Sequence, residues 1–149
     1  MGLIRSEECF LLSAQVANQM QLFERLAKCF NDHRNPQRIV QRIVHRLESL
    51  IGQRILGLVH GYEDLNDHEQ LRKDELLGAM LGCVESARAD CEALAGKSTL
   101  SRLEVAAAGL QADKGHKIQA DFEQLDQLLV DLFVESRARA PETVKVLAE

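Results

Sequence analysis

Five carboxylates crowd into one short segment of the chain, and carboxylates are the side chains that could hold divalent metal ions. They are Glu63, Asp64, Asp67, Glu69 and Asp74. Two-metal catalysis needs acids that converge from separate elements onto one point, whereas these five share a loop and the helix beside it. Acids in such a run more often cap helices and face solvent. We therefore assign no catalytic residue and no metal ligand in this segment.

Cysteine and histidine could also bind metal, but their spacing here argues against it. The 4 cysteines include no Cys-x-x-Cys pair, and none of the 5 histidines stands at a zinc-ligand spacing from them. Unpaired thiols are typical of a reducing compartment. No apolar run approaches the roughly 18 residues of a membrane span, and the first residues make a poor signal peptide. We expect a cytoplasmic protein with no membrane partner.

The segment AGKST, residues 95–99, resembles the end of a nucleotide-binding P-loop. A phosphate cradle needs a further glycine five residues before Gly96, and Cys91 stands there. It also needs a buried strand leading in, whereas the residues before Ala95 have the pattern of a helix or loop. A glycine stop followed by a Ser or Thr helix cap explains the segment better, and so we expect no nucleotide binding.

The same residues are candidates for contact with DNA. A glycine turn followed by STLSR is similar to the second helix of a helix-turn-helix, which places hydroxyl and basic side chains in a groove. The candidate contacts are Lys97, Ser98, Thr99 and Arg102. Short helices over 66–73 and 75–81 would support such a unit. A plain core helix explains the pattern about as well.

A row of arginines gives a second candidate DNA surface. Arg38, Arg42 and Arg46 stand four residues apart, and so they would share one face of a helix that also carries Arg54. Such a row suits contacts to phosphates, which position a protein on DNA without reading its sequence. A solvated helix face is the alternative. The net charge is −5, and an acidic stretch over 121–135 could pair with the arginines instead.

Helices are the elements that must position these residues. Caps and apolar periodicity predict helices over about 6–30, 36–58, 66–73, 75–81, 98–110 and 121–140. The glycines at 52 and 57 weaken the prediction for the end of the second helix. Residues 143–147 alone have strand character. With 149 residues, 46% of them hydrophobic, the chain fits one all-α domain: an irregular bundle of about five to seven helices with a short C-terminal strand.

Two motifs carry a resemblance to a known family. GYEDLNDHEQLRKD, residues 61–74, and LAGKSTLSRLE, residues 94–104, resemble the N-terminal region of DDE transposases from bacterial insertion sequences. The resemblance runs from about Ser6 to Pro141, and it implies that 5–140 form the helical N-terminal region of such a transposase. In that family an RNase H-like catalytic domain follows, and its first metal-binding acid stands in a pattern like DLDATDD.

The resemblance places that acid just after Pro141, where this chain has PETVKVLAE. We therefore expect 141–149 to be a remnant of the first catalytic strand, in a truncated chain without the DDE catalytic domain and without enzymatic activity of its own. Mg²⁺ is expected only for the missing domain, and no cofactor for this chain. The implied function is a helical module that binds transposon-end DNA weakly and could form a homo-oligomer. The alternative is a helical dimerisation or interaction module with no DNA binding of its own.

Overall fold

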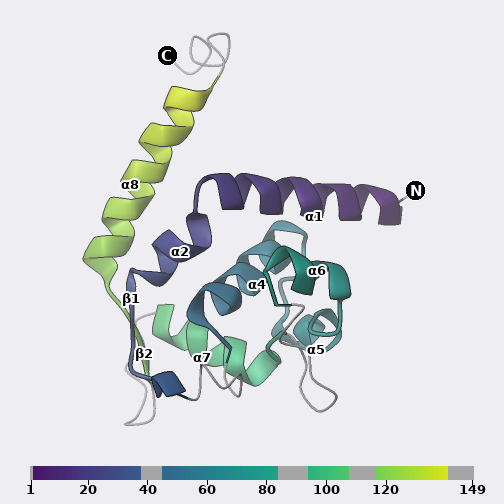
Figure 1. Ribbon diagram of the computed structural model, residues 1–149, viewed down its shortest axis with the longest axis horizontal. Helices are drawn as coiled ribbons and strands as arrows, with labels where there is room; N and C mark the ends of the chain where they lie inside the picture. The colour runs from purple at the N-terminus through teal and green to yellow at the C-terminus, as the bar shows by residue number, and fades with distance from the viewer. Residues whose placement is uncertain (1, 38–44, 84–93, 108–116, 141–149) are drawn as a thin grey trace.

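The computed structural model describes residues 2–37, 45–83, 94–107 and 117–140, and these parts are mostly helical (Figure 1). The α-helices are α1 (Gly2–Gln19), α2 (Leu22–Ala27), α4 (Leu47–Val59), α5 (His68–Leu71), α6 (Glu75–Met80), α7 (Lys97–Ala107) and α8 (Phe122–Arg139), and a 3-10 turn η1 (Leu65–Asp67) precedes α5. The predicted all-α class is confirmed. None of the described helices is long and apolar enough to cross a membrane.

Helix α4 occupies the centre of the molecule, with α1 and α2 on one side and α7 on the other (Figure 1). Leu50 and Leu56 of α4 are 0% and 2% exposed. The helix continues through both glycines, and neighbouring side chains pack closely against each of them. A Cβ at Gly52 would lie 2.5 Å from Cδ2 of Leu81, and one at Gly57 would lie 3.0 Å from Cε1 of His68.

The helix predicted over 36–58 is interrupted. It begins as expected at Pro36, where the Asn35 side chain accepts a hydrogen bond from the Gln37 amide at 2.9 Å. His45 and Arg46 are not helical, however, and Arg46 has extended backbone angles (φ −64°, ψ 149°) immediately before α4 begins. Arg46 is therefore not part of one continuous helix with Arg54, and the predicted row of arginines on a single helix is interrupted there.

The first predicted helix is also divided, at a residue with a left-handed backbone. Gln21 has φ 51° and ψ 38°, and it separates α1 from α2. The turn lets both helices pack on α4, so that Ala14, Ala17 and Phe23 all enter the core. The break between α1 and α2 thus results from tertiary packing, which could not be predicted from the local sequence.

A two-stranded antiparallel sheet joins the early and late parts of the chain. Strand β1 (Phe30–Asp32) pairs with β2 (Ile118–Ala120), with Phe30 opposite Ala120 and Asp32 opposite Ile118. The sequence predicted a helix as far as about residue 30 and no strand at β1 or β2, because three residues are too few to show an alternating pattern. The strand predicted over 143–147 lies outside the described residues.

Candidate nucleic-acid interface

Two adjacent polar residues of α4 hold the two motif segments together. Gln53 is 1% exposed, and its side chain forms two hydrogen bonds with the backbone of Ala95: Oε1 accepts from the amide at 2.9 Å, and Nε2 donates to the carbonyl at 2.9 Å. Nε2 also lies 3.1 Å from Nδ1 of His68. One amide thus connects α4 to the 94–104 segment and to the 61–74 segment.

Arg54 is the second of these residues, and it differs from the prediction. It is 8% exposed, with Nη1 donating to the Tyr62 carbonyl at 3.0 Å and Nη2 to the Glu63 carbonyl at 2.8 Å. Its Nε pairs with the carboxylate of Glu104 on α7. A buried guanidinium needs such partners, and these contacts engage the groups that would meet a phosphate. Arg54 therefore lacks the exposed position that the predicted DNA contact required.

His68 completes this buried network. Its side chain is 0% exposed, and burial, followed by the nearby positive charge of Arg54, lowers its pKa below the ordinary 6.5. The two bonds to Ala95 fix the orientation of the Gln53 amide, so Nε2 of Gln53 donates to Nδ1 of His68. Nε2 of His68 lies 3.4 Å from Nη1 of Arg54, so a donor stands on each side of the ring, and burial together with the charge of Arg54 favours the neutral form of His68.

A group of basic side chains surrounds one carboxylate at the start of α7. Oε1 of Glu69 accepts a hydrogen bond from the Lys97 amide at 2.9 Å, and Oε2 lies 3.7 Å from Nη1 of Arg72. The Lys97 amide bond lowers the pKa of Glu69, and the positive charges of Arg72, Lys97 and Lys73 add to this effect. Three cations from two segments therefore lie close together here.

Gly96 makes this approach possible. A Cβ at that position would lie 2.7 Å from Nη1 of Arg72 and 3.0 Å from Oε1 of Glu69. The glycine that the sequence indicated as a helix stop also leaves room for the Arg72 guanidinium beside α7. On the Lys97 side, Nζ donates to the Asn66 side chain at 3.0 Å.

Helix α7 presents the other predicted DNA contacts beside these cations. Ser98 and Arg102 are exposed and four residues apart, so they share one face, and Thr99 is half-buried next to them. Leu100 and Leu103 point into the core. The structure thus brings Lys97, Ser98, Thr99 and Arg102 together on one element. Sequence reasoning missed Arg72 and Lys73, although they stand inside the 61–74 motif at the end of a predicted helix.

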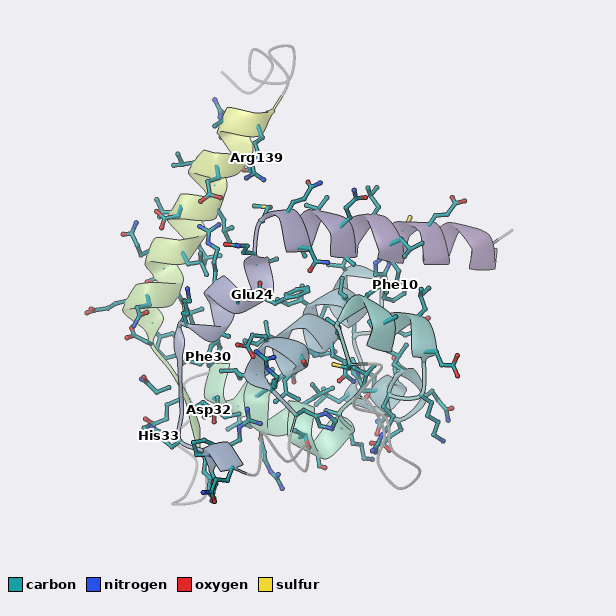
Figure 2. The ribbon with its side chains drawn as sticks, viewed as in Figure 1. Phe10, Glu24, Phe30, Asp32, His33 and Arg139 are labelled. Atoms are coloured by element: carbon teal, nitrogen blue, oxygen red, sulfur yellow. The ribbon has the colours of Figure 1, made fainter. Side chains whose placement is uncertain are left out.

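The arginine row predicted upstream is not a single surface in the described residues. Arg38 and Arg42 lie outside them. Arg46 is exposed and its Nε lies 3.6 Å from Oε2 of Glu48. Both residues line a hollow of about 660 Å³. Glu24, Phe30 and Asp32, which are labelled in Figure 2, also line it. Both acidic and basic side chains line the hollow, and so it is not a purely cationic surface.

The arginine that contacts the acidic late helix comes from another element. Arg25 of α2 forms a paired contact with Glu135 of α8, with Nη1–Oε2 and Nη2–Oε1 distances of 2.9 and 2.7 Å. Among the described residues, none of the predicted arginines pairs with α8.

Three of the five carboxylates in the 61–74 segment accept hydrogen bonds from amides at helix starts. Asp64 accepts the Asn66 amide at 2.8 Å, Asp74 accepts the Leu77 amide at 2.9 Å, and Glu69 accepts the first amide of α7. Asp64 thus caps the start of the helical segment that was predicted from residue 66. Across the described ranges, no group of three His, Cys, Asp or Glu residues is placed to hold a metal ion. We accordingly derive no catalytic step through magnesium from these residues.

Comparison with known families agrees with the resemblance of the two motifs. The model of the family described as transposase DDE domain, group 1, matches residues 2–147. The chain therefore belongs to this family of DDE transposases. Comparisons with curated proteins and with solved structures gave no match.

The family match corrects one prediction. We expected a chain without the DDE catalytic domain, and so without an enzymatic role, because no acid in a pattern like DLDATDD follows Pro141. The matching model is that of the DDE domain itself, and it covers nearly the whole chain. The prediction is therefore wrong: it relied on one short motif, whereas the helical segments themselves carry the pattern of the catalytic-domain family. The assignment of 141–149 to a catalytic strand lies outside the described residues and stays a prediction.

Proposed function

We propose that this chain binds transposon-end DNA as part of DDE transposition. Its family supports a role in transposition. The observation that carries the proposal is the meeting of three cations around Glu69, next to the exposed face of α7. We call this the α7 cationic surface, and it consists of Arg72, Lys73, Lys97, Ser98, Thr99 and Arg102.

The chemistry of this surface suits a nucleic acid. Lysine and arginine neutralise phosphates and set the position of the protein on the duplex. Ser98 and Arg102, side by side on α7, could contact base edges, where arginine favours guanine and serine accepts several partners. Arg38, Arg42 and Arg46 stay proposed phosphate contacts, and Arg54 is left out of the proposal because it is buried.

The same surface explains why the binding should be weak. The chain has a net charge of −5, and Glu69 already occupies the centre of the cation group. About three or four phosphate contacts would make affinity fall on the order of tens- to a hundredfold between 50 and 200 mM salt. We therefore expect measurable binding at low salt and poor binding at physiological salt.

The test compares two variants with equal loss of charge. The first replaces Lys73, Lys97 and Arg102 by alanine on the α7 cationic surface. The second replaces Lys28, Lys117 and Arg139, which are exposed elsewhere, and Arg139 stands on α8 far from α7 (Figure 2). Fluorescence anisotropy with a labelled transposon end and a scrambled duplex, at 50 and 200 mM salt, gives the affinities.

We expect the first variant to lose at least tenfold in affinity at 50 mM salt and the second to lose less than threefold, because only the first removes phosphate contacts. A smaller dependence of affinity on salt in the first variant would agree with this. Equal losses in the two variants would show that net charge alone governs binding, and no binding by the parent protein at low salt would reject the proposal.

One observation favours a second candidate function, that of a helical interaction module. Helix α8 carries large apolar side chains that the described residues leave exposed, among them Leu129, Phe133 and Val134 at 61%, 63% and 58%. Apolar surface of this kind marks an interface with another protein.

A further inference from the structure

Helix α8 has one face that is held against the rest of the protein. Leu128 is 7% exposed, and Glu135, seven residues later, forms the paired contact with Arg25 of α2. Residues seven apart lie on one side of a helix, and so these two contacts fix its rotation. The opposite side of α8 must face outward, and Figure 1 shows the helix standing beside α2 and extending away from α4 and α7.

The outward side is apolar along much of its length. Its exposed members are Phe122, Leu129, Val130, Phe133 and Val134, at 50–63%. In a helix that turns 100° per residue, Phe122, Leu129 and Phe133 fall within about 40° of one another. A stripe of this kind in water is unfavourable, because apolar side chains gain free energy when they are removed from water.

Two opposite charges flank the central part of this stripe, from Leu129 to Val134. Asp126 stands three residues before Leu129, and Arg137 stands three residues after Val134. Both fall on the outward side with the stripe. Within the described residues neither of them forms an ion pair, whereas Glu135 on the inward side does. The central part of the stripe, from Leu129 to Val134, therefore has an unpaired anion before it and an unpaired cation after it.

We propose that the outward face of α8 binds the same face of a second copy of this chain, in antiparallel orientation about a twofold axis. In this register Val130 lies opposite Phe133 of the second copy, and Leu129 lies opposite its Val134. Asp126 of each copy then lies opposite Arg137 of the other. A parallel pair would set Asp126 against Asp126, and so the charge pattern selects the antiparallel arrangement.

The contact should be modest in strength. Eighteen residues of helix span about 27 Å, which limits the buried area to the range of weak, reversible complexes. We expect a weak dimer that forms in a concentration-dependent way. The α8 dimer rests on the second candidate function, that of an interaction module. It does not involve DNA, so a failure of the dimer would leave the proposed DNA binding untouched, and a failure of DNA binding would leave the dimer untouched.

Charge reversal tests the register. Sedimentation velocity of the full chain without DNA is measured from 5 to 200 µM for the parent, Asp126→Arg, Arg137→Asp and the double variant with both changes. Each single reversal brings like charges together in both halves of the twofold contact, and should weaken the dimer at least tenfold. The double variant restores opposite charges, and should return to within about threefold of the parent.

Control variants separate this contact from other causes. Gln124→Arg adds a cation on the same helix four residues before Leu128, on the side away from the stripe, and should leave the dimer unchanged. Phe133→Ser should abolish it, while circular dichroism shows that the helices persist. A parent that stays monomeric at 200 µM, or a double variant no better than the single reversals, would overturn the proposal.

Discussion

Arg54 and Arg46 show how burial separates two residues of one type. Both were predicted as phosphate contacts, yet Arg46 is exposed and Arg54 is in the core. The sequence held a signal of this difference, because Arg54 follows Leu50 by four residues and Ile51 by three, and so it lies on the buried side of its helix. The partners of its guanidinium could not be predicted, since two of them are backbone carbonyls.

His68 makes the stability of the fold depend on pH. Its pKa lies below 6.5 in the folded protein, mainly through burial, and returns to about 6.5 on unfolding. The unfolded chain therefore binds more protons below that pH, and the contribution to stability, complete above about pH 6.5, is lost as the pH falls towards the folded pKa. Urea unfolding at pH 7.5 and 5.5 should show a lower midpoint at pH 5.5.

The variant His68→Gln should reduce this difference between the two pH values. Some difference should remain, because burial also lowers the pKa of His60, whose ring stacks on Phe10 at a centroid distance of 3.7 Å. Identical pH dependence in the parent and His68→Gln would show that His68 does not carry the effect.

Three helix beginnings were predictable from the sequence, whereas the breaks within two of the predicted helices were not. Asn35, Asp74 and Asp121 each cap the helix that the sequence assigned to them, because the cap is a local hydrogen bond to an amide two or three residues later. The breaks at Gln21 and at His45–Arg46 have no local signal of this kind. They arise from contacts with distant elements, and so they could not be predicted from one sequence.

The glycines of α4 give a prediction against the usual rule. Alanine normally stabilises a helix interior by roughly 1 kcal/mol over glycine. At Gly57, however, the new Cβ would lie 3.0 Å from the His68 ring, which is fully buried and held by Gln53. We expect Gly57→Ala to lower the free energy of unfolding by about 1–3 kcal/mol.

Urea denaturation measures this change, and a second background provides the control. When His68 is already alanine, the clash is gone, and Gly57→Ala should then be neutral or stabilising. If Gly57→Ala stabilises the parent protein itself, the His68 ring can move aside, and the close packing does not restrict this position.

At the scale of the whole molecule, α8 is attached by few contacts. It follows β2 directly, packs on α2 and is held there by Leu128 and by the Arg25–Glu135 pair. The core around α4 does not include these residues, apart from the sheet itself. Two parts of unequal stability therefore share one chain.

Weakening this attachment should release α8 without unfolding the rest. We expect the double change Leu128→Ala and Glu135→Gln to raise hydrogen exchange of α8 amides by at least tenfold at low protein concentration, while α4 amides change less than twofold. Hydrogen exchange with mass spectrometry resolves the two helices. Equal acceleration in α4 and α8 would show that the molecule opens as one unit.

The sheet that joins the two ends of the described chain also sets an order of events during synthesis. Strand β1 leaves the ribosome long before Ile118, the first residue of its partner strand β2. Arg25 is synthesised 110 residues before Glu135, with which it pairs. At 5 to 20 residues per second, this is a delay of roughly 5 to 20 seconds. During that time the edge of β1 is unpaired in the nascent chain, and a chaperone that recognises extended backbone would find it there.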